Sequence, residues 1–84
     1  MRLMAQHIEV QVLDRYGRAV MNERVSIFAT HIRSGGGSPD GITDSTGVAQ
    51  FDLDLDENEE VILYVRGREQ VSRSPLRSRY RIVT

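Results

Sequence analysis

The sequence predicts an all-β protein, a small antiparallel β-sandwich of seven strands, and three observations predict it. Apolar and polar residues alternate through most of the chain, which is the period of a strand with one buried face. Turn-forming residues separate the alternating segments at short intervals, as they do in sandwich proteins. No segment repeats apolar residues at the spacing of a helix. The length of 84 residues allows a single domain, residues 1–84, with a thin core.

The seven expected strands cover residues 6–13, 23–32, 41–44, 48–55, 61–65, 69–73 and 77–83. Of these, the first three differ in pattern and length. The first alternates apolar Ile8, Val10 and Val12 with polar neighbours. The second has apolar residues on both faces, which is typical of a central strand. The third is short and runs directly into a tight turn.

The remaining four strands differ in how apolar they are. The fourth alternates apolar residues such as Phe51 with acidic ones, and the fifth is the most apolar segment of the chain. Gly67 turns the chain into a weaker sixth strand, which Pro75 interrupts. The seventh places Tyr80 and Ile82 opposite arginines and valine. Half-buried strands with one charged face are therefore expected at the end of the chain.

Two turns of the same kind and one flexible loop connect these strands. Asp14 and Asp44 can each bond the backbone that follows, while Gly17 and Gly47 tolerate a positive φ. Residues 34–41 predict a flexible loop, because so many glycines beside a proline suit no packed element. The expected core consists of Val10, Val12, Val25, Ile27, Phe51, Leu53, Leu63 and Val65.

Three missing residue types exclude several chemistries. Without cysteine there is no disulfide, thiolate nucleophile or zinc–thiolate site. All eleven basic residues are arginine, so a lysine Schiff base is excluded. With no tryptophan and five other aromatic residues, the chain lacks the stacking surface typical of single-strand nucleic-acid binders.

The net charge of −1 conceals a segregation of charge along the chain. Residues 50–65 carry six acids and no base, whereas residues 66–84 carry six arginines and one acid. The alternating charges form an acidic set and an arginine set: Asp52, Asp54 and Asp56, and Arg77, Arg79 and Arg81. We expect the two sets to pair, either on adjacent antiparallel strands or between two chains. A nucleic acid would meet the acidic set beside the arginines, so such a partner is disfavoured.

Four segments follow one another along the chain in a characteristic order of strand and turn residues. Residues 10–14 read Val-Gln-Val-Leu-Asp, 17–20 read Gly-Arg-Ala-Val, 25–27 read Val-Ser-Ile and 43–51 read Thr-Asp-Ser-Thr-Gly-Val-Ala-Gln-Phe. Together with the apolar strand before Gly67, this order resembles the transthyretin-like, carboxypeptidase regulatory-like and bacterial immunoglobulin-like sandwiches. Ala19 stands where these families usually have proline. The resemblance implies an immunoglobulin-like fold, and spacer, adhesive or accessory modules at the cell envelope or outside the cell.

The function expected from these observations is that of a non-catalytic module. It would present loops and charged faces to another protein or to a second copy of itself, without a cofactor and without a membrane partner. The expected contacts are Arg73, Arg77, Arg79, Arg81, Asp52, Asp54, Asp56, Ser34, Gly36 and Asp40. We expect neither a signal peptide nor a membrane-spanning segment in this chain.

Three other possibilities remain open from the sequence. The transthyretin-like superfamily contains hydroxyisourate hydrolase, and the pair Tyr80-Arg81 resembles part of the signature that ends that family, without its Gly-Ser. An enzyme would use His7 or His31 as general base. The C-terminal arginines could instead bind nucleic acid. The alternating aspartates could hold calcium, but a strand would spread them over about 13 Å, so no metal site is expected.

Overall fold

Seven β-strands in two sheets make up the described part of the chain, which comprises residues 3–29, 40–56 and 59–84 of a computed structural model. The strands are β1 (Leu3–Leu13), β2 (Arg24–Ala29), β3 (Asp40–Ile42), β4 (Val48–Asp56), β5 (Glu60–Val65), β6 (Arg68–Pro75) and β7 (Arg79–Val83). The prediction of an all-β chain with seven strands is confirmed. These residues contain no helix long and apolar enough to cross a membrane.

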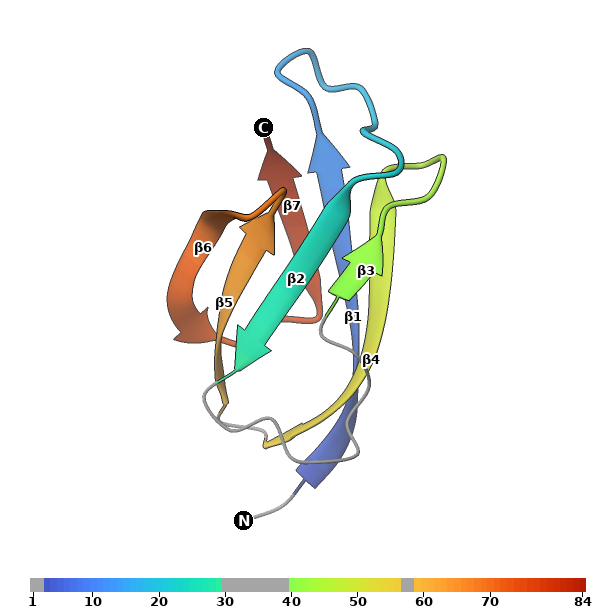
Figure 1. Ribbon diagram of the computed structural model, residues 1–84. Coiled ribbons are helices and arrows are strands. Elements are labelled where there is room, and N and C mark those ends of the chain that lie inside the picture. Colours follow the sequence, from blue (N-terminus) through green and yellow to red (C-terminus); the bar gives the residue numbers. More distant parts are fainter. Residues whose placement is uncertain (1–2, 30–39, 57–58) are drawn as a thin grey trace.

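The strands form a three-stranded sheet in the order β4-β1-β7 and a four-stranded sheet in the order β3-β2-β5-β6, as Figure 1 shows. Four of the five pairings between strands are antiparallel, but β1 and β7 run parallel. The prediction of a purely antiparallel sandwich is therefore wrong at this pair. After β6 the chain changes sheets, and β7 then lies along β1 in the same direction, as parallel neighbours joined by a crossover do.

The loop predicted over residues 34–41 ends earlier than expected. Asp40 and Gly41 belong to β3, which pairs with β2, so the prediction of a loop is wrong for Asp40, while Gly41 lies in the strand that was predicted to begin there. Ser26 and Arg24 of β2 both bond the Asp40 carboxylate, which explains how the strand begins there. The rest of that loop, with Ser34 and Gly36, and the predicted end of the second strand lie outside the described residues.

One core lies between the two sheets, and all eight residues predicted for it are buried, none more than 3% exposed. Apolar residues from the inner faces of both sheets form a single cluster. Thr43 is a buried polar residue beside it. Its hydroxyl donates to the Val20 carbonyl at 2.7 Å and accepts the Glu23 N–H at 2.8 Å, so no polar group there is left unsatisfied.

The two predicted aspartate turns are confirmed and are built alike. Asp14 accepts the N–H groups of Tyr16 and Arg18, and Gly17 has a φ of 81°. Asp44 accepts the hydroxyl and N–H of Thr46, and Gly47 has a φ of 78°. These donors hold the pKa of both carboxyls below the ordinary range, the Arg18 N–H being the main cause at Asp14 and the Thr46 hydroxyl at Asp44.

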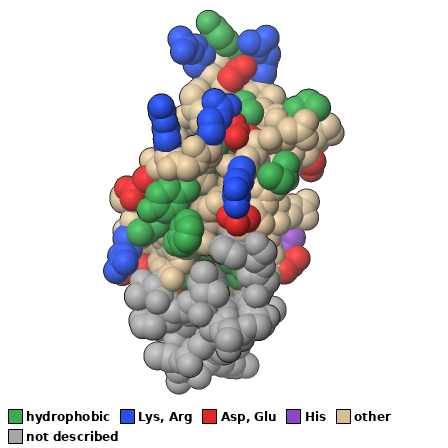
Figure 2. Space-filling model, in the orientation of Figure 1, with side chains coloured by type: hydrophobic (Ala, Val, Ile, Leu, Met, Phe, Trp, Pro, Cys, Tyr) green, Lys and Arg blue, Asp and Glu red, His purple; other side chains and the backbone are tan. Residues whose placement is uncertain are grey.

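Not every large apolar side chain of the described residues is covered. The exposed ones are Tyr16, Met21, Phe28, Ile42 and Val83. Figure 2 views the outer face of the four-stranded sheet, where hydrophobic side chains gather over β5 and the neighbouring part of β2, below several arginines. Exposed apolar side chains that gather in one patch are the kind of surface that partners cover.

Candidate functional site

The outer face of the three-stranded sheet carries a row of charged side chains, which we call the charged face. Asp52 of β4 lies 2.8 Å from Nδ1 of His7 on β1, and Nε2 of His7 lies 3.7 Å from Glu9. Glu9 in turn lies 3.7 Å from Nε of Arg79 on β7. Acid, imidazole, acid and guanidinium thus follow one another across the three strands.

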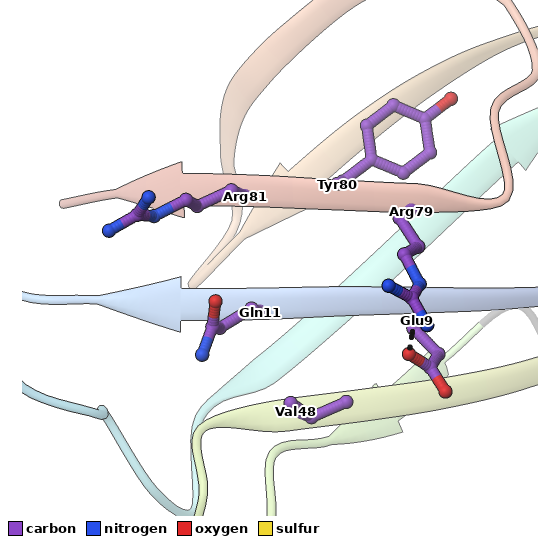
Figure 3. Close-up of a pocket in the computed structure, with 6 residues that line it drawn as sticks. All are labelled: Glu9, Gln11, Val48, Arg79, Tyr80 and Arg81. Carbon is purple, nitrogen blue, oxygen red and sulfur yellow. Dashed lines mark ion pairs between the residues drawn. The ribbon is translucent and has the colours of Figure 1, made fainter.

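A shallow groove of about 360 Å³ lies at the arginine side of this face. In Figure 3 the Arg79 side chain extends from β7 across β1 to Glu9, and Arg81 lies further along β7. The groove is lined by Glu9, Gln11, Val48, Arg79, Tyr80 and Arg81. Its guanidinium groups can bind a carboxylate through two parallel hydrogen bonds.

The structure separates the two charged sets that the sequence predicted to meet. Strand β1 lies between β4 and β7, so the prediction that the aspartates and arginines lie on adjacent antiparallel strands is wrong. Asp52 contacts His7 instead, and Arg79 contacts Glu9. The Asp54 and Asp56 side chains lie outside the described residues, although their backbone continues β4 as a strand.

The other predicted arginines lie away from this face. Arg73 is in β6, in the other sheet. Arg77 is in the connection to β7, where its N–H donates to the Tyr80 hydroxyl at 3.0 Å. The four arginines expected at the end of the chain therefore do not form one continuous stripe.

His7 is the histidine that the structure describes, since His31 lies outside the described residues. Its two ring nitrogens face carboxylates, and the hydrogen bond to Asp52 is the main cause of a raised pKa, with Glu9 adding to it. A general base needs a free, neutral nitrogen directed at the substrate. Asp52 on Nδ1 orients the ring as a carboxylate does for a catalytic histidine, whereas Nε2, the nitrogen that such a base would use, faces Glu9 at 3.7 Å.

We expect His7 to titrate above its ordinary pKa of 6.5, and Asp52→Asn to bring the value back towards it. Because the folded pKa is raised, the contact stabilises the fold fully below the unfolded pKa, and this contribution is lost as pH rises through the folded pKa. An NMR titration of the imidazole protons measures both values, with His31→Gln to assign the signals. An unchanged pKa in Asp52→Asn would show that the hydrogen bond does not form in solution.

The outer face of the four-stranded sheet carries an exposed aromatic pair. Phe28 of β2 is 51% exposed, and its ring stands edge-to-face against Tyr64 of β5, with centroids 5.3 Å apart and planes at 85°. This is a favoured geometry for two aromatic rings. The pair follows from register, because Phe28 lies opposite Ile62 and Ser26 lies opposite Tyr64.

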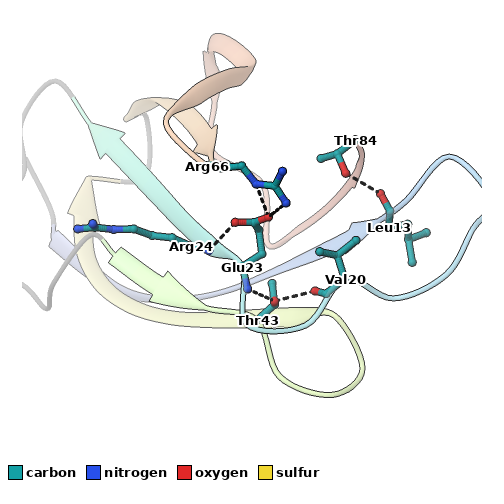
Figure 4. A network of polar contacts seen from close by, with 7 residues as sticks. All are labelled: Leu13, Val20, Glu23, Arg24, Thr43, Arg66 and Thr84. Atoms are coloured by element: carbon teal, nitrogen blue, oxygen red, sulfur yellow. Dashed lines mark hydrogen bonds and ion pairs between the residues drawn. The ribbon is translucent and has the colours of Figure 1, made fainter.

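Two ion pairs flank the aromatic pair. The Asp40 carboxylate accepts the Ser26 hydroxyl at 2.5 Å and an Arg24 N–H at 3.0 Å, and these donors lower the pKa of Asp40, the hydroxyl being the larger cause. On the other side the Arg66 guanidinium donates to Glu23 and is the main cause of that carboxyl's lowered pKa (Figure 4).

The β5–β6 hairpin places Arg66 at this position. Arg66 and Gly67 both have positive φ, 56° and 77°, as a two-residue type I′ turn requires. Arg66 is an uncommon residue for that conformation. Its N–H donates to the Arg24 carbonyl at 3.0 Å and its side chain reaches Glu23, so the contacts with the neighbouring β2 segment compensate the turn.

We call this surface the aromatic face. It is a groove of about 730 Å³ lined by Glu23, Arg24, Ser26, Phe28, Asp40, Tyr64, Arg66 and Gly67. Of these residues, Asp40 alone is predicted as a contact from the sequence. The signal for the others was present in the alternation, because Phe28 and Tyr64 are out of phase with the buried residues of their strands.

The described residues form no metal centre on either face. Among residues 3–29, 40–56 and 59–84 no three histidine or acidic side chains come close enough to hold a metal ion. Residues 52–56 form a strand. A strand spaces alternate residues too far apart for their carboxylates to converge on one ion as in a calcium loop.

Comparison of the chain with protein-family models, with curated proteins and with solved structures gave no match. The resemblance to transthyretin-like and immunoglobulin-like sandwiches therefore stays a prediction. The chemistry and the geometry of the charged face and the aromatic face are therefore the basis for proposing a function.

Proposed function

We propose that the protein is a non-catalytic binding module that recognises another protein through the aromatic face. The observation that carries this proposal is the half-exposed Phe28, held against Tyr64 on an ordered strand surface. An apolar ring exposed to water gains free energy when a partner covers it. Aromatic residues and arginine are enriched in protein interfaces and contribute most of their binding energy.

The ion pairs support the same proposal. Arg24 and Arg66 are already held by Asp40 and Glu23 in the free protein, so less side-chain entropy is lost when a partner binds. The backbone below them is strand and a tight hairpin, which keeps the groove in one shape. A rigid aromatic centre with a charged rim is typical of a preformed protein-binding surface.

Two observations favour binding over the alternatives that the sequence left open. Asp52 orients His7 as a carboxylate orients a general base, but His7 does not line the groove beside Arg79, so the hydrolase is the weaker interpretation. Arg73 and Arg79 lie in different sheets, so the arginines offer nucleic acid no continuous track. An immunoglobulin-like accessory role at the cell envelope, which the resemblance implies, is compatible with this function.

Site-specific photo-crosslinking tests the proposal. With benzoylphenylalanine at position 28, in cells that naturally make the protein, we expect one discrete adduct with another protein. The control carries the same group at Tyr16, which is 74% exposed in the turn after β1 and lies outside the aromatic face. Tyr64→Ala should reduce the position-28 adduct. Equal adducts at positions 16 and 28, or none at 28, would contradict a binding role for this face.

A further inference from the structure

The backbone register places aspartates at every second position of β4 beside one end of β1, and arginines at every second position of β7 beside the other end. On β4, Asp52, Asp54 and Asp56 lie opposite His7, Ala5 and Leu3, along the first part of β1; we call these three aspartates the acidic end. On β7, Arg79 and Arg81 lie opposite Glu9 and Gln11, along the later part of β1; we call these two the arginine end.

The two ends cannot neutralise each other within one chain. They are on opposite edges of the sheet, with centres about five residues apart along β1 and two strands apart across the sheet, or roughly 20 Å in all. Arg79 is 83% exposed with Glu9 at 3.7 Å, and Arg81 forms no ion pair with any residue that the structure describes. At such a distance two exposed charges are largely screened from one another. The complementarity is therefore available to another molecule.

We propose that the charged face is where two copies of this chain pack against each other as a symmetric dimer. A two-fold axis in the interface, between the two ends, places the acidic end of each copy on the arginine end of the other. A two-fold interface requires a surface that is complementary to itself. Opposite charges at the two ends of one face meet that requirement, whereas a face of one sign would repel its copy.

The size of the face indicates how stable this dimer is. The eleven residues of β1 span about 36 Å and three strands span about 14 Å, so the face covers roughly 500 Å² per copy. That is near the lower limit for a specific interface. Val48 and Tyr80 give the groove apolar surface beside the charged Glu9, Arg79 and Arg81. We therefore expect a reversible dimer that salt dissociates.

Sedimentation velocity of the full chain tests this first. The protein should be a dimer at low ionic strength and a monomer at about 1 M salt, where the Debye length is about 3 Å. A monomer at low salt, up to the solubility limit of the chain, would overturn the proposal. A dimer equally stable at both salt concentrations would also overturn it, because its contacts would then not be the charged ones.

Exchange of charge gives the decisive measurement. Arg79→Glu with Arg81→Glu makes both ends acidic, and Asp52→Arg with Asp54→Arg makes the acidic end basic, so each double variant alone should be a monomer. An equimolar mixture should form a heterodimer, since both pairs of ends are then opposite in sign. Failure of the mixture to associate would overturn the proposal. If the mixture does associate, the loss of the dimer in each double variant is due to repulsion between like charges and not to a general effect of the substitutions.

Two controls separate this inference from the proposed function. Arg68→Glu with Arg73→Glu changes the same number of charges on β6, in the other sheet, and should leave the dimer unchanged. Phe28→Ala alters the aromatic face and should leave it unchanged too. The dimer does not rest on the proposed function, so loss of the position-28 adduct with the dimer intact would contradict only the binding role.

Discussion

Phe51→Ala should lower the free energy of unfolding by about 3–5 kcal/mol, a large part of the stability of so small a domain. Phe51 is 3% exposed and belongs to the core cluster. Its ring also packs on β3 of the other sheet, since a Cβ at Gly41 would lie 2.9 Å from its Cζ. Removing the ring leaves a cavity between the two sheets. Urea unfolding followed by circular dichroism measures the loss.

Phe28→Ala is the matched control, because it removes the same atoms from the surface. Phe28 is 51% exposed, so its ring buries much less area and its loss should cost about 1 kcal/mol or less. Phe28→Ala also removes the ring contact with Tyr64, so the difference between the two variants is a lower limit on the contribution of burial. Equal losses would mean that Phe51 does not lie in the core of the protein in solution.

The strands were predictable because their signal is local. In β4 every second residue is apolar, and Ala49, Phe51 and Leu53 are all buried. The aspartate turns were predictable for the same reason, since Asp44 and Gly47 form the turn within four residues. A turn needs no information from the rest of the chain.

Strand order was not predictable, because it depends on contacts between distant segments. His7 and Asp52 are 45 residues apart in sequence, and the local sequence of neither segment indicates which strand it pairs with. Alternating charges on two strands show that the strands could pair, but not which strand lies between them. The error about the aspartates and arginines arose in this way, as did the missed parallel pairing of β1 with β7.

The aromatic face was missed for a different reason. The apolar residues on both faces of β2 were interpreted as those of a central strand, and β2 does lie between β3 and β5. Pattern alone does not tell whether a second layer covers the outer face. In the structure Phe28 is half exposed, so it is a candidate contact residue and not a core residue. Asp40 was predicted as a contact from a loop, whereas it reaches the groove from β3.

Gly47→Val should lower the free energy of unfolding by about 2–5 kcal/mol, the sum of left-handed backbone strain and of overpacking. Gly47 has a φ of 78°, which valine adopts only at a cost. In addition, a Cβ at this position would lie 2.7 Å from the Val12 carbonyl oxygen and 3.1 Å from the Ala19 Cβ. Backbone of β1 cannot move away easily, because the Val12 N–H donates to the Gly47 carbonyl at 2.7 Å.

Gly17→Val separates the two contributions. Gly17 occupies the matching position of the other aspartate turn with a φ of 81°, but a Cβ there would have nothing within 4 Å. This variant should show the strain alone, about 1–2 kcal/mol. Thermal unfolding of both variants beside the wild type gives the comparison, and the Gly47 variant should melt at the lower temperature. If the two variants melted together, β1 would not lie against the second turn, and the close packing of Gly47 on Val12 would be wrong.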